Sequence, residues 1–416
     1  MRIPWLFPDP EGTLLEWKAR YNGFLQGNLS EQFRLNTALE NGGLGQSGRD
    51  RITHTLRHKE AQRAHVLELL EPLGLDGTQA SDAVAALRSK LPKSQGLSSY
   101  YNNIFRDWAW NNGENEELLD AVRGALKADD RERIGKILTI GAGSCRLPYD
   151  LHREYAPDLS VALDINPLLM LLGSRVIQGE SVPFCEFPIA PLNQASFAVR
   201  HDCRAPEPID AANGGFQFLF ADGMNPPFKP GSFDTVLTPW LIDIVPEDLR
   251  EFIPRVNRVL KKGGVWLNTG SLAFFHKDVT WRYSEEEVLE LIESMGFEIL
   301  SAERTNIRYL HSPHSAHGRM EKVFTFSARK KKNITSPPRY EYLPQWIIDS
   351  AQPIPSLFEF SIASSDHLLH AQVLAAIDGE RTVDEIAALV AKQYGLQQDE
   401  AANAVQRILL ELYEDK

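Results

Sequence analysis

The spacing of apolar residues changes along the chain and separates it into regions. Before about residue 130, apolar residues recur every three to four positions, as in ITHTLRHKEAQRAHVLELLEPLG (52–74) and QASDAVAALRSKL (79–91). This is the period of an amphipathic helix. The pattern therefore predicts an N-terminal helical region over residues 1–130.

From Lys136 onward, short apolar runs alternate with stretches of helical length. Continuous apolar runs rich in β-branched and aromatic residues, separated in this way, indicate a parallel sheet with both faces covered. The pattern predicts a doubly wound α/β domain over residues 131–332. The runs are KILTI (136–140), SVALDI (160–165), FQFLFAD (216–222), FDTVLTPWLI (233–242), GGVWLNTG (263–270) and EKVFTFSA (321–328).

The end of the chain has a different composition. A basic cluster and five prolines lie in ARKKKNITSPPRYEYLPQWIIDSAQPIPS, and such prolines disfavour regular structure. We expect a linker over residues 333–356 and a small domain of three helices over 357–416. In that domain, Asp378-Gly379 predicts a turn, and Thr382 with Glu385 predicts a capping box at the start of a helix.

Composition and charge narrow the classes of partner. The chain has 416 residues, 43% of them hydrophobic, and a formal net charge of -12. This charge argues against nucleic acid held by phosphate contacts and against an anionic membrane surface. No apolar stretch approaches the length of a membrane span, and the three cysteines lack zinc-type spacing. We expect a cytoplasmic protein without nucleic-acid or membrane partners.

Glycines and an acidic residue mark a nucleotide-cofactor site. Gly141 and Gly143 directly follow the first predicted strand, where glycine lets the backbone turn sharply and approach a ligand. Asp164 ends the next strand, where a carboxylate can accept hydrogen bonds from a ribose diol. The alternative for Asp164 is a cap at the strand end.

The residues after the glycines select the cofactor. A dinucleotide site normally has a third glycine beside the pyrophosphate, whereas this chain has Arg146 there. An arginine fork suits the amino-acid carboxylate of S-adenosylmethionine (SAM). After the third strand, Asp222 is placed to accept from an adenine amino group, with Gly223 beside it; a turn aspartate is the alternative. The set predicts a SAM-dependent methyltransferase rather than a nicotinamide-binding domain.

Several segments between about residues 95 and 328 resemble carnosine N-methyltransferase-like proteins. This resemblance implies a class I methyltransferase fold, Rossmann-like, with a mostly parallel seven-stranded sheet. It implies that SAM is held by Gly141, Gly143, Arg146, Asp164 and Asp222, that Asp243 binds the substrate, and that His276 lies beside the acceptor nitrogen. The segments are NNIFRDWAWNNGENEELLDAV, GAGSCRLPYDL, FPIAPLNQASFAVRHDCRAPEP, TPWLIDIV and GGVWLNTGSLAFFH.

The chain departs from this family before its last strand. The family has a tyrosine there that contacts the dipeptide, whereas this chain reads GRMEKVFTF. Tyr309 and Arg319 are the nearest candidates for binding the substrate. The acceptor therefore need not be carnosine itself.

Asp243 and His276 follow the fourth and fifth strands of the predicted sheet. The carboxyl ends of such strands meet at one crevice, so the two side chains are expected to face one substrate. Asp243 would orient an acceptor ring, and His276 would exchange its proton. The alternatives are that Asp243 caps the helix near PEDLREFIPRV and that His276 is an ordinary loop or core histidine.

Three histidines, His311, His314 and His317, follow one another at intervals of three. On a helix they would share a face and could bind a metal, but Pro313 and nearby glycine favour a loop. The loop either faces the substrate, with Arg319 available for a carboxylate, or is merely solvated. We predict no metal here.

The segment VLAAIDGERTVDEIAALVAKQYG resembles small winged-helix domains of the PqqD-like type, which bind peptides. The alternative is an appendage that packs on the protein or forms a homodimer. We predict a SAM-dependent N-methyltransferase that methylates an imidazole nitrogen of histidine or a small histidine-containing compound. A methyltransferase acting on a peptide presented by the C-terminal domain, and a non-catalytic binding scaffold, remain alternatives.

Overall fold

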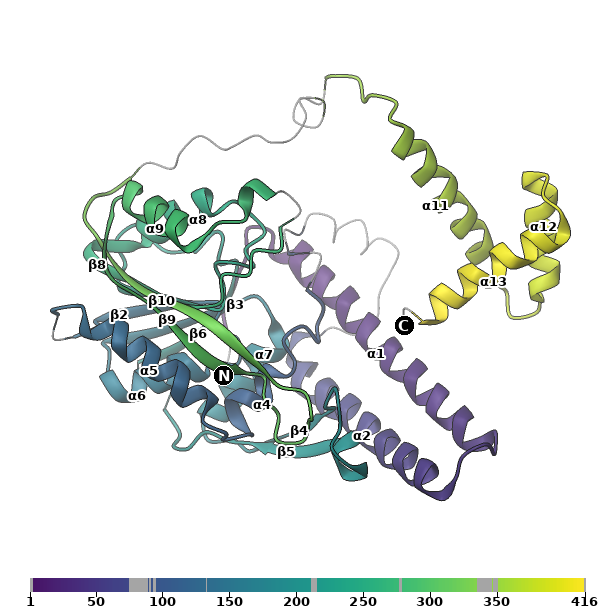
Figure 1. Ribbon diagram of the computed structural model, residues 1–416, viewed down its shortest axis with the longest axis horizontal. Coiled ribbons are helices and arrows are strands. Elements are labelled where there is room, and N and C mark those ends of the chain that lie inside the picture. Colours follow the sequence, from purple (N-terminus) through teal and green to yellow (C-terminus); the bar gives the residue numbers. More distant parts are fainter. Residues whose placement is uncertain are drawn as a thin grey trace. The chain divides into compact units, whose positions relative to one another are not determined.

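The computed structural model describes residues 3–74, 89, 91–92, 95–131, 133–210, 215–276, 279–334, 346 and 351–414. The chain divides into two compact units, Met1–Pro337 and Pro338–Lys416 (Figure 1). Most of the helix predicted over 79–91 and most of the linker predicted over 333–356 lie outside the described residues.

An eight-stranded sheet forms the centre of the first unit, in the order β1-β6-β3-β2-β7-β8-β10-β9. In this order, the six strands β1, β6, β3, β2, β7 and β8 pair in parallel. Strand β10 pairs antiparallel with both β8 and β9. The predicted mostly parallel, doubly wound sheet is confirmed. The strands are β1 (Trp5–Leu6), β2 (Lys136–Ile140), β3 (Leu159–Asp164), β6 (Phe216–Ala221), β7 (Phe233–Pro239), β8 (Leu260–Gly270), β9 (Phe297–Tyr309) and β10 (Arg319–Lys330).

The sheet has one strand more than the seven expected. Strand β1 comes from the N-terminal segment and pairs with β6, with Trp5 opposite Phe220. Strand β2 lies between β3 and β7; the chain passes from β2 to β3 and β6 on one side, and then returns to β7 and β8 on the other side. This is the topological switch point, where open α/β sheets bind their ligands.

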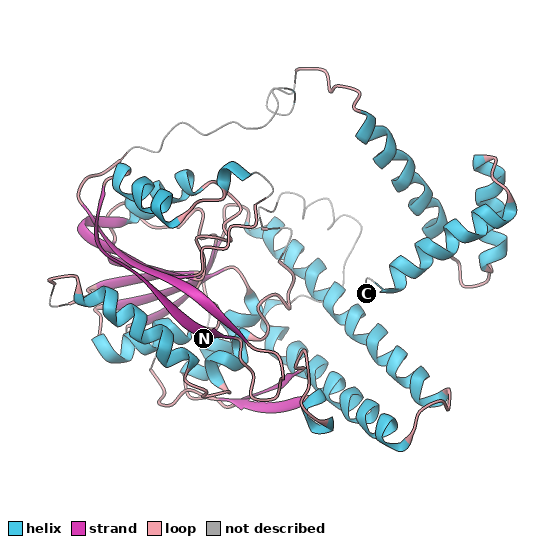
Figure 2. Ribbon diagram, in the orientation of Figure 1, coloured by secondary structure: helices cyan, strands magenta, loops and turns pink. Residues whose placement is uncertain are grey.

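Helices cover both faces of this sheet (Figure 2). Along β2, Ile137 packs with α5 and α6, whereas the next residue, Leu138, belongs to the core on the opposite face with α8 and α9. This alternation follows from the two-residue period of a strand. The helices are α4 (Asn103–Trp108), α5 (Glu114–Lys127), α6 (Arg146–Tyr155), α7 (Pro167–Ile177), α8 (Leu249–Val259) and α9 (Glu285–Ser294).

Two long helices, α1 (Pro10–Glu40) and α2 (Gln46–Leu70), confirm the helical pattern predicted near the N-terminus. Trp17 of α1 and Val66 of α2 are fully buried, in one core with Met170 of α7. The N-terminal helices therefore share a hydrophobic core with the α/β domain.

The long connection after α7 forms a separate two-stranded antiparallel sheet that the apolar pattern does not predict. Its strands are β4 (Val182–Glu186) and β5 (Val199–Cys203). Between them, Pro191 pairs with Ser315 in an isolated bridge. The hairpin thus contacts the loop between β9 and β10.

The second unit consists of α11 (Phe358–Ala376), α12 (Val383–Tyr394) and α13 (Gln398–Glu414). Its own small core includes Val373, Val390 and Val405. The predicted three helices and the capping box of Thr382 and Glu385 are confirmed. No strand of a winged-helix domain occurs in the part of this unit that the structure describes.

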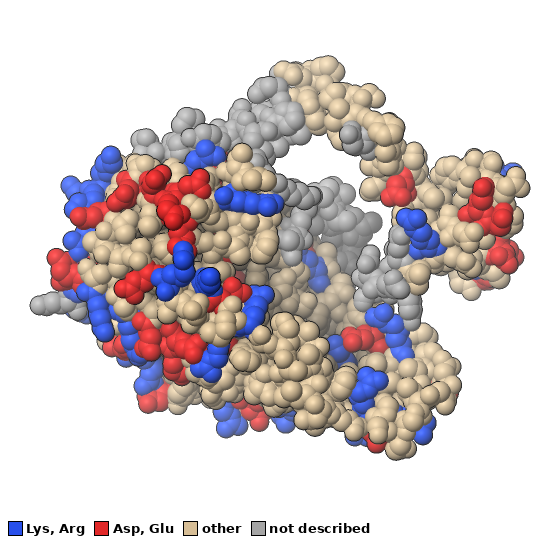
Figure 3. All heavy atoms as spheres, in the orientation of Figure 1, with Lys and Arg blue, Asp and Glu red and all other residues tan. Residues whose placement is uncertain are grey.

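The distribution of surface charge and the apolar character of the helices are relevant to the predicted partners. On the face of the first unit shown in Figure 3, acidic and basic side chains are interspersed. Within the ranges described, no helix combines the length and the apolar character needed to cross a membrane.

Candidate active site

The glycine loop follows β2 and turns the chain into α6. Gly141 has φ +75° and Gly143 has φ +56°, values in the left-handed region that glycine adopts without strain. A Cβ at Gly143 would meet no atom within 4 Å, whereas one at Gly141 would lie 3.1 Å from the side chain of Leu241. The loop thus borders open space on one side and the end of β7 on the other.

Asp164 connects the end of β3 to the glycine loop. Its Oδ2 accepts from the backbone N–H of Gly143 at 2.7 Å, and its Oδ1 accepts from that of Asn166 at 2.8 Å. Burial raises the pKa of Asp164 to about 6. Each carboxylate oxygen has two lone pairs, so both oxygens can also accept from a ribose diol.

Asp222 and Gly223 follow β6, the neighbour of β3. Asp222 accepts from the backbone N–H of Met224 at 2.8 Å and from Asn225 Nδ2 at 3.1 Å, so it stabilises its own turn as well. A Cβ at Gly223 would lie 2.4 Å from Ile140 Cγ2. Glycine at this position lets the β6 loop approach the end of β2.

Arg146, predicted to hold a carboxylate of SAM, has protein partners. Its Nε donates to both carboxylate oxygens of Asp150, at 3.0 and 2.8 Å, and its Nη1 donates to the carbonyl of Asp107 at 2.7 Å. These bonds fix α6 against the end of α4. They also occupy much of the guanidinium that the sequence interpretation assigned to the ligand.

Arg106 on α4 was not predicted as a site residue. Its Nε donates to Asp107 Oδ1 at 2.7 Å, but its buried Nη1 has no hydrogen-bond partner among the described residues. The buried Oδ1 of Asn103, one helical turn earlier, lacks one as well. Orphaned buried polar atoms are costly, and a carboxylate and an ammonium group are the complementary partners. Together with the open glycine loop and Asp164, this pair fits SAM.

Asp243 lies just beyond β7 and is half-buried. Its Oδ2 accepts from the backbone N–H of Ala273 at 2.9 Å and from Ser271 Oγ at 3.3 Å, and burial raises its pKa. The residue that caps α8 is Asp248, which accepts from the backbone N–H of Arg250. The alternative that Asp243 caps this helix is therefore wrong.

His276 lies in the segment after β8 that Asp243 holds. Its half-buried ring stacks on Trp281, with centroids 4.2 Å apart and an interplanar angle of 28°. Its backbone carbonyl accepts from Arg282 Nε at 2.7 Å. Asp243 thus anchors the start of the segment that carries His276, and the aromatic contact orients the ring near its end.

Tyr309 and Arg319 stand at the ends of β9 and β10, opposite each other in the ladder. The Tyr309 ring contacts Trp240, with centroids 4.7 Å apart, and the Arg319 guanidinium, 4.4 Å from the ring centroid. Arg319 Nε also pairs with Glu321 at 2.7 Å. The two predicted substrate residues therefore form one contact.

Tyr100, a residue not predicted for the site, lies near both halves of it. Partial burial raises the pKa of Tyr100, and the neighbouring Tyr309, Asp164 and Asp243 raise it further. Its φ of +61° is uncommon for a residue with a side chain. The segments that carry the predicted cofactor and acceptor residues also approach each other at Gly141, where a Cβ would lie 3.1 Å from the side chain of Leu241, two residues before Asp243.

Comparisons with known proteins identify the family to which the sequence is similar. The profile of the carnosine N-methyltransferase family matches residues 84–332, more than half of the chain. The Drosophila melanogaster carnosine N-methyltransferase unmet is 27% identical over 235 residues, 51% of this chain and 50% of that protein. The Dictyostelium discoideum carnosine N-methyltransferase is 22% identical over 241 residues, 53% of this chain and 51% of that protein. The chain spans about half the length of these curated relatives.

Solved structures are also similar to parts of this chain. Phosphoethanolamine N-methyltransferase 2 of Haemonchus contortus, solved in complex with SAM, has 16% identity and a TM-score of 0.36 over 58% of this chain and 62% of that chain. The YcgJ protein of Bacillus subtilis has 13% identity and a TM-score of 0.36 over 51% of this chain and 99% of that chain. From the extent of the family match, the chain belongs to the carnosine N-methyltransferase family.

Proposed function

We propose that this protein is a SAM-dependent methyltransferase that methylates an imidazole nitrogen of histidine or of a small histidine-containing compound such as carnosine. Family membership supports the reaction class. The observation that carries the proposal is the close approach of the glycine loop, which Asp164 holds, to the segment that carries Asp243: a Cβ at Gly141 would lie 3.1 Å from the side chain of Leu241. A cofactor on Asp164 and an acceptor on Asp243 would therefore meet in one crevice.

The proposed chemistry asks little of the protein beyond alignment and proton transfer. Bound SAM supplies a methyl group already activated by the sulfonium. Holding an acceptor nitrogen in line at about 3 Å contributes several kcal/mol to lowering the barrier. The nitrogen attacks only when it is unprotonated, so the other ring nitrogen must carry and then release the proton.

Asp243 is suited to that second nitrogen. One of its oxygens is held by Ser271 and Ala273, and the other can accept the N–H of the acceptor ring and orient it. Burial raises the pKa of Asp243, which makes the carboxylate a better base toward the developing imidazolium. His276, in the segment that Asp243 anchors, would then pass the proton to solvent.

Tyr309 and Arg319 would recognise the rest of the acceptor. The Trp240–Tyr309 contact provides an aromatic wall, against which an imidazole can stack. Arg319 supplies a cation for the carboxylate of an amino acid or dipeptide. On binding of a compound with a free carboxylate, Arg319 would leave Glu321 and pair with the carboxylate of the acceptor.

A second candidate acceptor is a peptide recruited by the C-terminal unit. Large apolar side chains are exposed along α11, including Phe358 at 76%, Ile362 at 55% and Leu368 at 57%. Exposed apolar residues gathered on one element favour binding of another chain. This unit would then deliver a histidine within the peptide to the methyltransferase.

Assays with SAM over histidine, carnosine and histidine-containing peptides would test these proposals. They need the full chain and a shortened chain that ends at Lys332. Turnover of histidine or carnosine by both chains supports the first proposal. Turnover of peptides alone, by the full chain alone, supports the second. Calorimetry that finds no binding of SAM or S-adenosylhomocysteine would refute both and favour a non-catalytic scaffold.

A further inference from the structure

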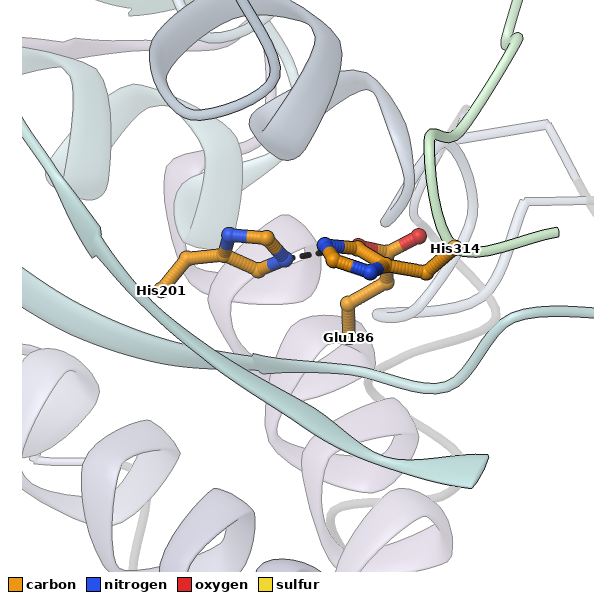
Figure 4. A group of neighbouring side chains, drawn as sticks. All are labelled: Glu186, His201 and His314. Carbon is orange, nitrogen blue, oxygen red and sulfur yellow. Dashed lines mark hydrogen bonds and ion pairs between the residues drawn. The ribbon is translucent and has the colours of Figure 1, made fainter. Parts of the chain in front are cut away.

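Three side chains from distant parts of the sequence converge beside the hairpin of β4 and β5. Glu186 ends β4, His201 lies on β5, and His314 belongs to the loop between β9 and β10. Figure 4 shows the three side chains pointing toward one another, and their ligand atoms all lie within 4.8 Å of one another. Of the three histidines at intervals of three, only His314 joins this group.

Glu186 is 1% exposed and is oriented by neutral donors. Trp110 Nε1 donates to its Oε2 at 3.0 Å, and Ser312 Oγ donates to its Oε1. Among the ion pairs of the described residues, the only partner of Glu186 is His201. No described lysine or arginine therefore pairs with this buried carboxylate.

The two histidines are held in place before any ligand binds. Nε2 of His201 lies 2.7 Å from Glu186 Oε2, and its ring contacts Phe105, with centroids 5.2 Å apart. The His314 ring centroid lies 5.5 Å from that of His201. The carbonyl of His314 accepts from the backbone N–H of Leu192, and its own N–H donates to Ser312 Oγ. Both rings therefore sit on segments fixed by other contacts.

We propose that Glu186, His201 and His314 bind a divalent transition metal, with Zn²⁺ as the first ion to test. Two neutral imidazoles and one carboxylate form a donor set that zinc uses, with a fourth position left for water or substrate. Trp110 and Ser312 are the outer partners that orient the ligating carboxylate. The metal supplies the positive charge that the buried Glu186 lacks.

The proposed metal would connect the β4–β5 hairpin to the β9–β10 loop. Tyr309 and Arg319, the proposed acceptor residues, stand at the two ends of this loop. Glu114 already fixes its beginning by accepting from the backbone N–H groups of Leu310 and His311. A metal on His314 would fix its middle. This effect on the acceptor rests on the proposed function, whereas metal binding itself does not.

Titration of the chelator-treated full-length protein would test the site. Calorimetry with Zn²⁺, and the visible absorption of Co²⁺ as a probe of coordination, should both give one site per chain. His314→Ala and Glu186→Gln should weaken Zn²⁺ binding at least about tenfold, since each removes one of three ligands. His317→Ala is the matched control, because this exposed histidine lies in the same loop outside the group; its affinity should equal that of the wild type.

His201→Gln separates a metal site from a mere hydrogen bond. The glutamine amide can still donate to Glu186, so the ligand-free variant should keep the fold and melting temperature of the wild type. Zn²⁺ should raise the melting temperature of the wild type and not that of this variant. The proposal is overturned if the wild type binds neither Zn²⁺ nor Co²⁺, or if all the variants bind Zn²⁺ equally.

The acceptor assay keeps the two proposals apart. If the proposed function holds, removal of the metal should raise the KM for the acceptor while the affinity for S-adenosylhomocysteine stays unchanged. A protein that binds Zn²⁺ through these residues but methylates no histidine compound would refute the proposed function alone. A protein that methylates carnosine but binds no metal would refute the metal site alone.

Discussion

Lowering the pH should weaken the binding of S-adenosylhomocysteine through one buried carboxyl group, that of Asp164. Burial raises the pKa of Asp164 to about 6, and only the ionised form accepts two hydrogen bonds from the ribose diol. Above this pH the carboxylate is already ionised and binding has its full strength. As the pH falls through about 6, a proton must be released on binding, and the affinity declines.

The size of this effect follows from the two pKa values. If the ribose hydroxyls return the pKa of Asp164 in the complex to its ordinary value of 3.8, about nine tenths of the free protein, but under a tenth of the complex, carries the proton near pH 5. The dissociation constant near pH 5 should then be about tenfold larger than at about pH 7.5, equivalent to about 1.4 kcal/mol. Most of the decline should occur between about pH 6 and pH 4.

Isothermal titration calorimetry across this pH range, in buffers of different ionisation enthalpy, measures both the affinity and the protons released. Close to one proton should be released per ligand near pH 5 and almost none near pH 7.5. In Asp164→Asn the affinity should be lower and independent of pH. Circular dichroism at each pH controls for unfolding. An equal affinity at both pH values in the folded wild type would refute the assignment of Asp164 to the ribose.

Other substitutions test the remaining residues of the site. His276→Ala should reduce turnover on the order of a hundredfold while calorimetry finds unchanged affinity for SAM; near-normal turnover would make it a structural histidine. Asp243→Asn should raise the KM for the acceptor and lower kcat, again without loss of SAM affinity; steady-state kinetics that show neither change would remove it from the acceptor site. Arg106→Lys should weaken SAM binding by about tenfold or more, since one charge-assisted hydrogen bond to a carboxylate contributes roughly 1.5–3 kcal/mol. An unchanged affinity for SAM in calorimetry would show that Nη1 of Arg106 does not bind the cofactor. Gly223→Ala should destabilise the fold by about 1–3 kcal/mol in denaturant unfolding, because the new Cβ would lie 2.4 Å from Ile140 Cγ2. Adding Ile140→Val should recover part of that loss, and no recovery would point to strain elsewhere.

The sequence predicts the centre of the sheet well because its strands are buried on both faces. The residues of β2 after Lys136 are all buried, so the strand reads as one apolar run. Strand β9 was missed because most of FEILSAERTNIRY is exposed or half-buried and carries charged residues. Strand β1 has only two residues and forms only because β6 offers an edge. Neither strand has a local pattern that identifies it.

Site residues on strand ends could be predicted, whereas those that depend on burial or distant contacts could not. Gly141 and Asp164 follow apolar runs at informative spacing. Arg106 lies within a quoted motif, but its unpartnered Nη1 depends on how α4 packs. Glu186 and His314 meet only through the pairing of the β4–β5 connection with the β9–β10 loop. The spacing of His311, His314 and His317 does not indicate that Glu186 lies beside His314.

In the proposed reaction, one crevice brings a SAM methyl group to an imidazole nitrogen. The most direct measurement is mass spectrometry of histidine, carnosine and histidine-containing peptides incubated with the full-length protein and methyl-labelled SAM. We predict a product that carries one labelled methyl group on the imidazole ring, and its loss in Asp243→Asn. Label transfer to another functional group, or no transfer by a protein that binds SAM, would refute methylation of the imidazole.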